Sequence, residues 1–178
     1  MVVFCSVPVL VFAQDKGLSS QACYAAFSKY TPEKVIQMAE KVQDHVIKNG
    51  KKGFSDLNRP SPMVWPEVPL SPVVSVVNCG EMKLETFAIP EMYEAVTTKG
   101  FLRKFVDADG QPTFVKLCAK IRSENGRAWV MQNHYWAGCD GPLKMGVLLV
   151  KVPNSPYSVQ VSLPSDKISL SLLNRALK

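Results

Sequence analysis

The sequence predicts an α+β fold in which helices pack on one face of an antiparallel sheet. Two observations lead to this class. Helical periodicity dominates the N-terminal third, whereas the C-terminal half holds short apolar strands separated by tight turns. Helices and strands in separate runs, rather than in strict alternation, favour antiparallel pairing with the helices set apart.

Two successive helices, or one long helix with a proline boundary, are expected near the N-terminus. The first spans about 21–30, and the second begins at Thr31-Pro32-Glu33, where a capping hydroxyl precedes a proline and an early acid. Its apolar residues recur at helical spacing and form one stripe: Val35, Ile36, Ala39, Val42, Val46 and Ile47. Gly50 ends this helix, which would brace the sheet.

A proline-rich segment and a hairpin follow. Residues 60–72 contain Pro60, Pro62, Pro66, Pro69 and Pro72, which exclude a regular helix or a central strand. Strands are expected at 73–77 and 84–89. Asn78-Cys79-Gly80-Glu81 joins them, and Asn and Gly at so short a connection are typical of a hairpin.

The stretch 107–130 encodes a turn, a helix, a second turn and a strand. Asp109-Gly110 favours a turn, and Thr113 is placed to cap the next helix. The apolar face of that helix consists of Phe114, Leu117, Cys118 and Ile121. Asn125-Gly126 ends the helix, and the apolar run that starts at Ala128 begins a strand.

Three strands and a helix complete the chain. The strands are expected at 128–136, 143–152 and 157–163. The second is apolar on both faces and is therefore central, whereas Ser158, Gln160 and Ser162 give the third a solvent-facing side. An amphipathic helix should span about 165–176.

The N-terminus has the pattern of a secretory signal. Residues 1–12 are almost wholly apolar, and Val11-Phe12-Ala13 provides a small-residue cleavage site. We therefore expect a signal peptide at 1–13 and a single periplasmic or secreted domain at 14–178. The alternative is a buried N-terminal strand. No other segment is apolar over the length that a membrane span needs.

Five cysteines are present, and Cys5 would leave with the signal peptide. The remaining four, Cys23, Cys79, Cys118 and Cys139, form an even set suited to disulfides in an oxidising compartment. Four cysteines allow three pairings, and the sequence does not choose among them. Free buried thiols are the alternative. Without a C-x-x-C pair, zinc and redox sites lack their usual spacing.

Charge and motifs argue against several functions. The formal net charge is +6 and the pI about 9.1, but the clusters at 48–52 and 103–104 are best interpreted as solvated surface. No basic stripe with interleaved aromatics predicts nucleic-acid binding. The hydrolase, metalloprotease, phosphate-loop and dinucleotide motifs are missing, so we expect neither an enzyme nor a cofactor. His45 is expected at the surface and His134 in a structural role.

The stretch 107–130 resembles the single Cache domain, an extracytoplasmic sensor module of bacterial receptors. The matching residues are Gly110, Pro112, Phe114, Val115, Lys116, Gly126, Trp129 and Val130. The resemblance implies a PAS-like, five-stranded antiparallel sheet with a long N-terminal helix behind it. It also implies a ligand pocket on the other face, with small carboxylates as the ligand class.

The candidate ligand contacts centre on one strand. Trp129, Met131, Asn133 and Tyr135 alternate along it and should share a face. The resemblance implies a cation for a carboxylate at Lys144 on the next strand. Phe87 and Trp65 could close the pocket. The alternative is that the apolar members are core and that Lys144 lies at the surface.

The chain departs from the family where its pocket contacts should begin. The family continues Trp-Val-Asp-Tyr, whereas this chain has Met131 and Gln132 after Val130, and Asn78 stands in place of a usual Asp. We predict a non-enzymatic sensor-type domain that binds a small organic anion. It would need a membrane-bound signalling partner, or it would serve as a scavenging or carrier protein. The alternatives are an interaction scaffold with a filled core and a secreted enzyme with an unrecognised site.

Overall fold

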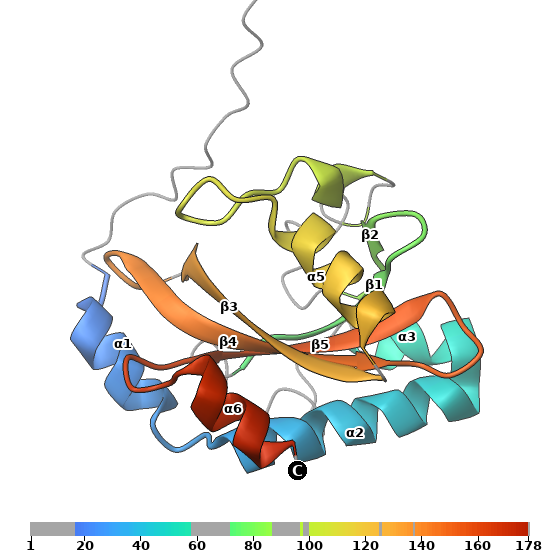
Figure 1. The fold of residues 1–178 in the computed structure, drawn as a ribbon, viewed down its shortest axis with the longest axis horizontal. Helices are drawn as coiled ribbons and strands as arrows, with labels where there is room; N and C mark the ends of the chain where they lie inside the picture. Colours follow the sequence, from blue (N-terminus) through green and yellow to red (C-terminus); the bar gives the residue numbers. More distant parts are fainter. Residues whose placement is uncertain are drawn as a thin grey trace, which may run out of the picture.

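Five strands form one antiparallel sheet in the order β2-β1-β5-β4-β3 (Figure 1). The structure is a computed structural model that describes residues 17–57, 72–86, 97, 100–124, 126–136 and 138–177. The strands are Val74–Asn78 (β1), Lys83–Leu84 (β2), Arg127–Tyr135 (β3), Pro142–Lys151 (β4) and Tyr157–Pro164 (β5).

The α+β class, the first hairpin and the central position of β4 are confirmed. The expected signal peptide and residues 60–71 lie outside the described residues.

The helices follow the predicted order. They are Ser20–Phe27 (α1), Pro32–Asn49 (α2), Phe54–Leu57 (α3), Thr113–Ser123 (α5) and Leu170–Ala176 (α6), with 3-10 turns at Gly50–Gly53 (η1) and Phe101–Arg103 (η2). The Thr31 hydroxyl accepts a hydrogen bond from the Lys34 amide at 3.4 Å, and Pro32 is the first residue of α2. Gly50 ends α2 with φ of 56°, which glycine adopts without strain.

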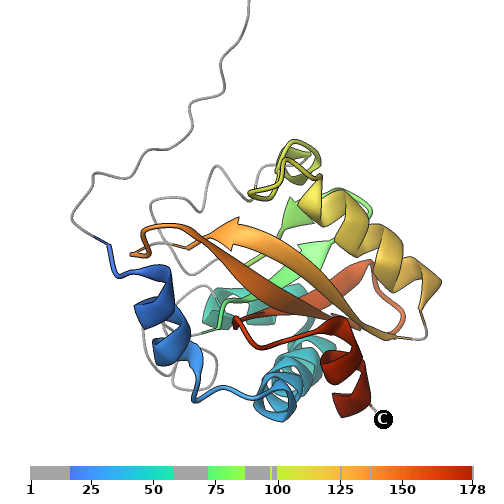
Figure 2. The same ribbon diagram turned by 60° about the vertical axis from the view of Figure 1, so that its left-hand side comes forward.

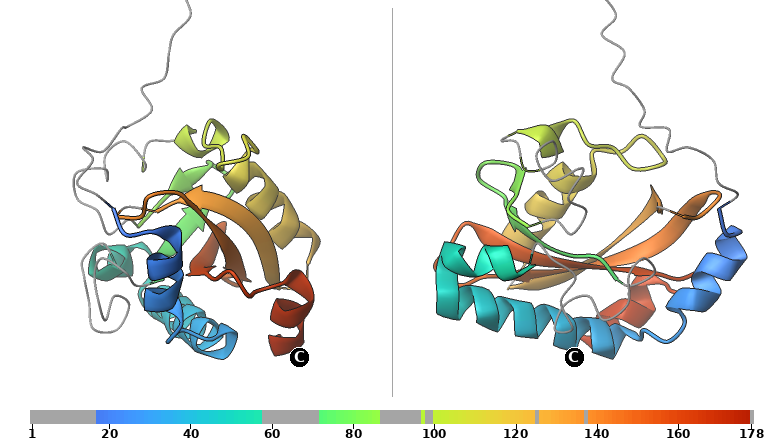
Figure 3. Two further views of the ribbon diagram at one scale, coloured as in Figure 1. Left: turned by 90° about the vertical axis from the view of Figure 1, so that its left-hand side faces the viewer. Right: turned by 180° about the vertical axis from the view of Figure 1, so that it is seen from behind.

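The long helix α2 packs along one face of the sheet (Figure 3). Its buried residues Val35, Ala39 and Val42 share a core with Val76, Val159 and Val161 of the central strands. Leu173 of α6 joins this core. Gly146 makes room for it, because a Cβ at this position would come within 2.6 Å of the Leu173 side chain and force that side chain to shift. We call this side of the sheet the α2 face.

The opposite side, which we call the α5 face, is covered as well. Leu117, Cys118 and Ile121 of α5 pack with Met145, Val147 and Leu149 of β4 in a second core. Helices were expected on one face, and this expectation holds for α2, α3 and α6, whereas α5 and η2 lie across the sheet from them (Figure 1). The physical reason is that the apolar stripe of α5 needs a partner, and the α5 face of β4 provides it.

Burial on the α5 face corrects one prediction. Ser158 and Gln160 were expected to face solvent, but only 2% and 3% of their surfaces are exposed. The alternation along β5 was right, and Val159 and Val161 point to the α2 face. The prediction failed on the surroundings of the polar side chains of β5. Alternation shows which residues share a face, but not whether that face meets water or protein.

Two helix starts and one histidine also differ from expectation. Pro112, and not Thr113, occupies the N-cap position of α5 and provides no side-chain cap. The last helix begins at Leu170 rather than near 165. His45 is partly buried instead of lying free at the surface, and its Nε2 atom is 3.1 Å from the Gly53 carbonyl oxygen.

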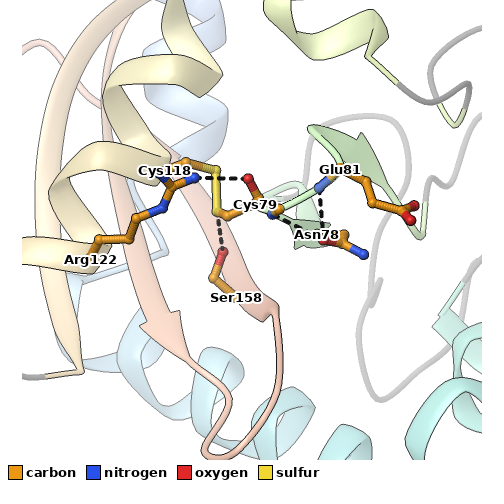
Figure 4. Close-up of a disulfide and its surroundings, with 7 residues drawn as sticks. Asn78, Cys79, Glu81, Cys118, Arg122 and Ser158 are labelled. Carbon is orange, nitrogen blue, oxygen red and sulfur yellow. Dashed lines mark hydrogen bonds between the residues drawn. A yellow bond between two sulfur atoms is a disulfide. The ribbon is translucent and has the colours of Figure 1, made fainter.

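Two disulfides connect distant parts of the chain. Cys23–Cys139 joins α1 to the turn between β3 and β4, across 116 residues. Cys79–Cys118 joins the β1–β2 turn to α5, across 39 residues (Figure 4). The Arg122 guanidinium also donates to the Cys79 carbonyl oxygen at 2.9 Å. The even set of four cysteines is therefore paired, and the pairing that the sequence left open is settled.

Replacing Cys79 and Cys118 together by Ala should lower the free energy of unfolding by about 2–4 kcal/mol, because the unfolded chain regains the entropy of an open loop. Urea denaturation measures this loss. Hydrogen exchange should also accelerate in the amides of α5. In the matched control, Cys23→Ala with Cys139→Ala, stability should fall while α5 stays protected. Equal protection of α5 in both variants would contradict the anchoring role of Cys79–Cys118.

Candidate ligand-binding site

A row of polar side chains runs along the centre of the α5 face. Ser158, Gln160 and Ser162 of β5 alternate with the valines that point to the α2 face. Ser75 of β1 lies directly opposite Gln160 in the strand register. Ser75, Ser158 and Gln160 are all buried, and Ser162 is half-buried. Buried polar side chains at the middle of a sheet are unusual unless they serve a hydrogen-bonding purpose.

Gln160 has an unsatisfied donor. Its side-chain nitrogen Nε2 is fully buried and has no hydrogen-bond partner among the described residues. A buried donor without an acceptor costs about 1–3 kcal/mol relative to a satisfied one. An amide NH₂ group carries two donor hydrogens, so a ligand oxygen placed beside Gln160 would remove this cost.

The acidic turn before α5 is fixed to β3. The Asp107 carboxylate accepts hydrogen bonds from the Asp109 and Gln111 amides at 3.0 and 2.8 Å. Asn133 of β3 donates from Nδ2 to the Asp109 carboxylate at 2.8 Å, and its carbonyl oxygen accepts from the Ala108 amide at 2.8 Å. The turn that carries the Asp-Gly motif thus docks on the outer edge of β3 and holds the start of α5.

His134 lies where the turn, α5 and β3 meet. Its Nε2 atom is 3.3 Å from the Thr113 hydroxyl, and its ring centroid is 5.5 Å from that of Phe105. Burial lowers the pKa of His134 below its usual value, and the nearby Asp107 carboxylate opposes this shift. His134 is therefore held in its neutral form at neutral pH. The structural role predicted from the sequence fits these contacts.

The predicted ligand contacts on β3 do not gather on the α5 face. Trp129 is 1% exposed and belongs to the core of the α2 face, against which Met131 also packs. Tyr135 is 73% exposed. A ligand on the α5 face would meet β3 through Gln132 and His134 instead, because side chains alternate along a strand.

The remaining predicted contacts are spread more widely. Asn133 and Lys144 are paired across β3 and β4, but the Asn133 amide is engaged by the acidic turn. Lys144 is exposed, and its backbone amide donates to the Tyr24 hydroxyl at 2.6 Å. Trp65 and Phe87 lie outside the described residues. The role of these side chains as ligand contacts remains a prediction.

Sequence reasoning placed Gln160 on a strand but gave it no role in the site. Two predictions together indicated where the strand of Gln160 lies in the sheet. Strand 143–152 was expected to be central because it is apolar on both faces, and a central strand needs a neighbour on each side. The next strand along the chain is the natural neighbour, which places Gln160 on an interior strand but does not show what covers its polar face.

Other kinds of site find no support in the described residues. Within them, no three His, Cys, Asp or Glu side chains gather as a metal site would require. In the same part of the chain, no helix combines the length and the apolar character that crossing a membrane demands.

Comparison with known proteins identifies the fold. No family model and no curated protein matches the chain. A solved structure described as "Periplasmic sensor domain of chemotaxis protein" is similar with a TM-score of 0.52 and 13% identity, covering 83% of this chain and 95% of its own. A second, described as "Structural basis for carboxylic acid recognition by a Cache chemosensory domain", has the same TM-score and identity and covers 82% and 98%. The chain therefore has the fold of a single Cache domain, as the stretch 107–130 predicted.

The depressed pKa of His134 makes stability depend on pH in a defined direction. Protonation is easier in the unfolded chain, whose histidines titrate near the ordinary value of 6.5. The stabilisation from neutral His134 is thus present above that pH and is lost as the pH falls below it. We expect wild type to lose more stability than His134→Gln between pH 7 and pH 5, as measured by urea denaturation. Parallel pH profiles for the two proteins would contradict the buried, neutral histidine.

Proposed function

We propose that this protein is an extracytoplasmic sensor-type domain that binds a small organic anion, with a carboxylate as the first candidate. The single observation that carries the proposal is the buried, unpartnered Nε2 atom of Gln160 at the centre of the α5 face. A group of this kind is stabilised when a ligand supplies an acceptor. A carboxylate has only acceptor oxygens and fits the requirement.

The Cache fold supports the proposal by analogy. One similar structure is described as a periplasmic sensor domain and the other as a domain that recognises a carboxylic acid, although identity is only 13% in both cases. A fold by itself does not determine function, so the weight rests on Gln160. The two disulfides suit an oxidising compartment, in keeping with a periplasmic or secreted location.

Neighbouring groups on the α5 face would give the ligand orientation. Ser75 lies opposite Gln160, and Ser162 is two residues further along β5. Each serine hydroxyl can donate or accept a hydrogen bond, so it can pair with either an acceptor atom or a donor atom of a ligand. A membrane-bound partner would be needed to carry the signal further.

Gln160→Leu tests the proposal because it removes the amide and keeps a similar volume. The stability of the ligand-free variant should equal or exceed that of wild type, since a buried unsatisfied donor is lost. A thermal-shift series with acetate, propionate and other small carboxylates should raise the melting temperature of wild type in a concentration-dependent manner. The variant should lose this response.

Gln37→Leu is the matched control, because Gln37 is exposed on α2. It should respond to the carboxylates as wild type does. If wild type shows no response to any of them, the proposed ligand class is wrong. If wild type responds and Gln160→Leu responds equally, the ligand does not bind at Gln160.

A further inference from the structure

Positive charge gathers at the C-terminal end of α2. Lys48 lies in the last turn of this helix, and Lys51 and Lys52 follow it in η1. All three side chains are exposed, and none has a carboxylate within ion-pair distance among the described residues. The helix dipole favours a cation in the last turn and so accounts for Lys48, whereas Lys51 and Lys52 lie beyond the end of the helix.

The end of β4 brings a fourth lysine to the same place. Gln43 of α2 donates from Nε2 to the Lys151 carbonyl oxygen at 2.7 Å, and the ring centroids of Phe54 and Tyr157 are 5.2 Å apart. These contacts join both sides of the turn between β4 and β5 to α2 and α3. Figures 1 and 3 accordingly show the turn beside the C-terminal end of α2. Lys151 is exposed, and it has no ion-pair partner in the part of the chain that the structure describes.

An exposed apolar side chain lies among these lysines. Ile47 directly precedes Lys48, and 54% of its surface is exposed. It is one helical turn from Gln43, the residue that contacts the end of β4. Pro153 in the turn between β4 and β5 is exposed as well. One exposed isoleucine is ordinary in a soluble protein, but an apolar projection among unpaired lysines is typical of surfaces that meet a bilayer.

Few acidic groups offset the lysines. The second half of α2, η1, α3 and the turn between β4 and β5 contain two acids, Asp44 and Asp56. The Asp56 carboxylate lies 3.3 Å from Nε2 of His45, which engages it locally. Four lysines against two aspartates leave this end of the molecule positive, so its field attracts an anionic surface.

We propose that this end of the molecule, formed by residues 47–52 and 151–153, docks on a bilayer that contains anionic phospholipids. The lysines contact headgroup phosphates, and Ile47 enters the interfacial layer. A soluble polyanion would satisfy the lysines but offers no apolar phase for Ile47, which favours a bilayer. Docking would hold the domain at a membrane surface, and it does not depend on which ligand the domain binds.

Co-sedimentation with vesicles tests the proposal. The purified protein should bind vesicles of phosphatidylglycerol and phosphatidylcholine in equal parts, and it should not bind vesicles of phosphatidylcholine alone. Each lysine near an anionic surface contributes about fivefold in affinity, so the triple variant Lys48→Ala, Lys51→Ala, Lys52→Ala should bind about a hundredfold more weakly. Ile47→Ser should bind about tenfold more weakly, because less apolar surface enters the bilayer.

Matched controls separate a local contact from the net charge of the protein. The triple variant Arg103→Ala, Lys104→Ala, Lys116→Ala removes the same charge from η2 and α5, and Figure 2 shows α5 across the sheet from α2. Val115→Ser removes another exposed apolar side chain from α5. Both variants should keep most of the affinity of wild type, and Gln160→Leu should keep all of it, which separates docking from ligand binding on the α5 face.

Two results overturn the proposal at once: no binding to the phosphatidylglycerol vesicles, or an equal loss of affinity in the two triple variants, since net charge alone would then drive binding. Unchanged vesicle binding by Ile47→Ser, together with binding of the protein to soluble dextran sulfate, would assign the lysines to a soluble polyanion and overturn it as well. Every variant keeps the apolar residues 1–12, so these cannot cause a difference between variants.

Discussion

The alternation of side chains along β5 is the constraint on which the rest of the structure depends. β5 pairs with β1 along one edge and with β4 along the other, and side chains on both of its faces are buried. Its valines complete the core against α2, and Ser158 and Gln160 are buried on the α5 face. Because a shift of register by one residue would exchange these two sets, the position of Gln160 is tied to the stability of the main core.

The cover of the α5 face is held by connections that do not depend on apolar packing alone. Cys79–Cys118 fixes the middle of α5 to the β1–β2 turn, and Arg122 reinforces this connection at the Cys79 carbonyl (Figure 4). At its other end, α5 starts from the acidic turn that Asn133 holds on β3. These connections fix the start and the middle of α5 over β3 and β4, the strands on which its apolar side packs.

Much of the fold could be predicted from the sequence. The cap at Thr31, the hairpin at Asn78-Cys79-Gly80-Glu81 and the Gly110 turn are local signals, and local interactions decide them. The disulfide pairing could not be predicted, because it depends on which turns meet across the sheet. The cover of the α5 face was missed for the same reason, since α5 is apolar on one side but its sequence does not show which surface it contacts.

The candidate site was harder to predict than the fold. Trp129 was singled out because it lies in the stretch 107–130 that resembles a known family, yet its side chain belongs to the core of the α2 face. Gln160 has no motif around it and is distinguished only by burial without a partner. Burial of a single polar group depends on contacts between residues distant in sequence, so a single sequence offers no direct sign of it.

The side-chain amide signals of Gln160 test the central claim most directly. In ¹⁵N-labelled protein titrated with a small carboxylate such as propionate, the account predicts that the two Gln160 NH₂ signals shift in a saturable manner and exchange more slowly with solvent. Their assignment follows from their loss in Gln160→Leu. Signals that stay unchanged at saturating propionate, while other residues respond, would contradict a ligand-binding role for the α5 face.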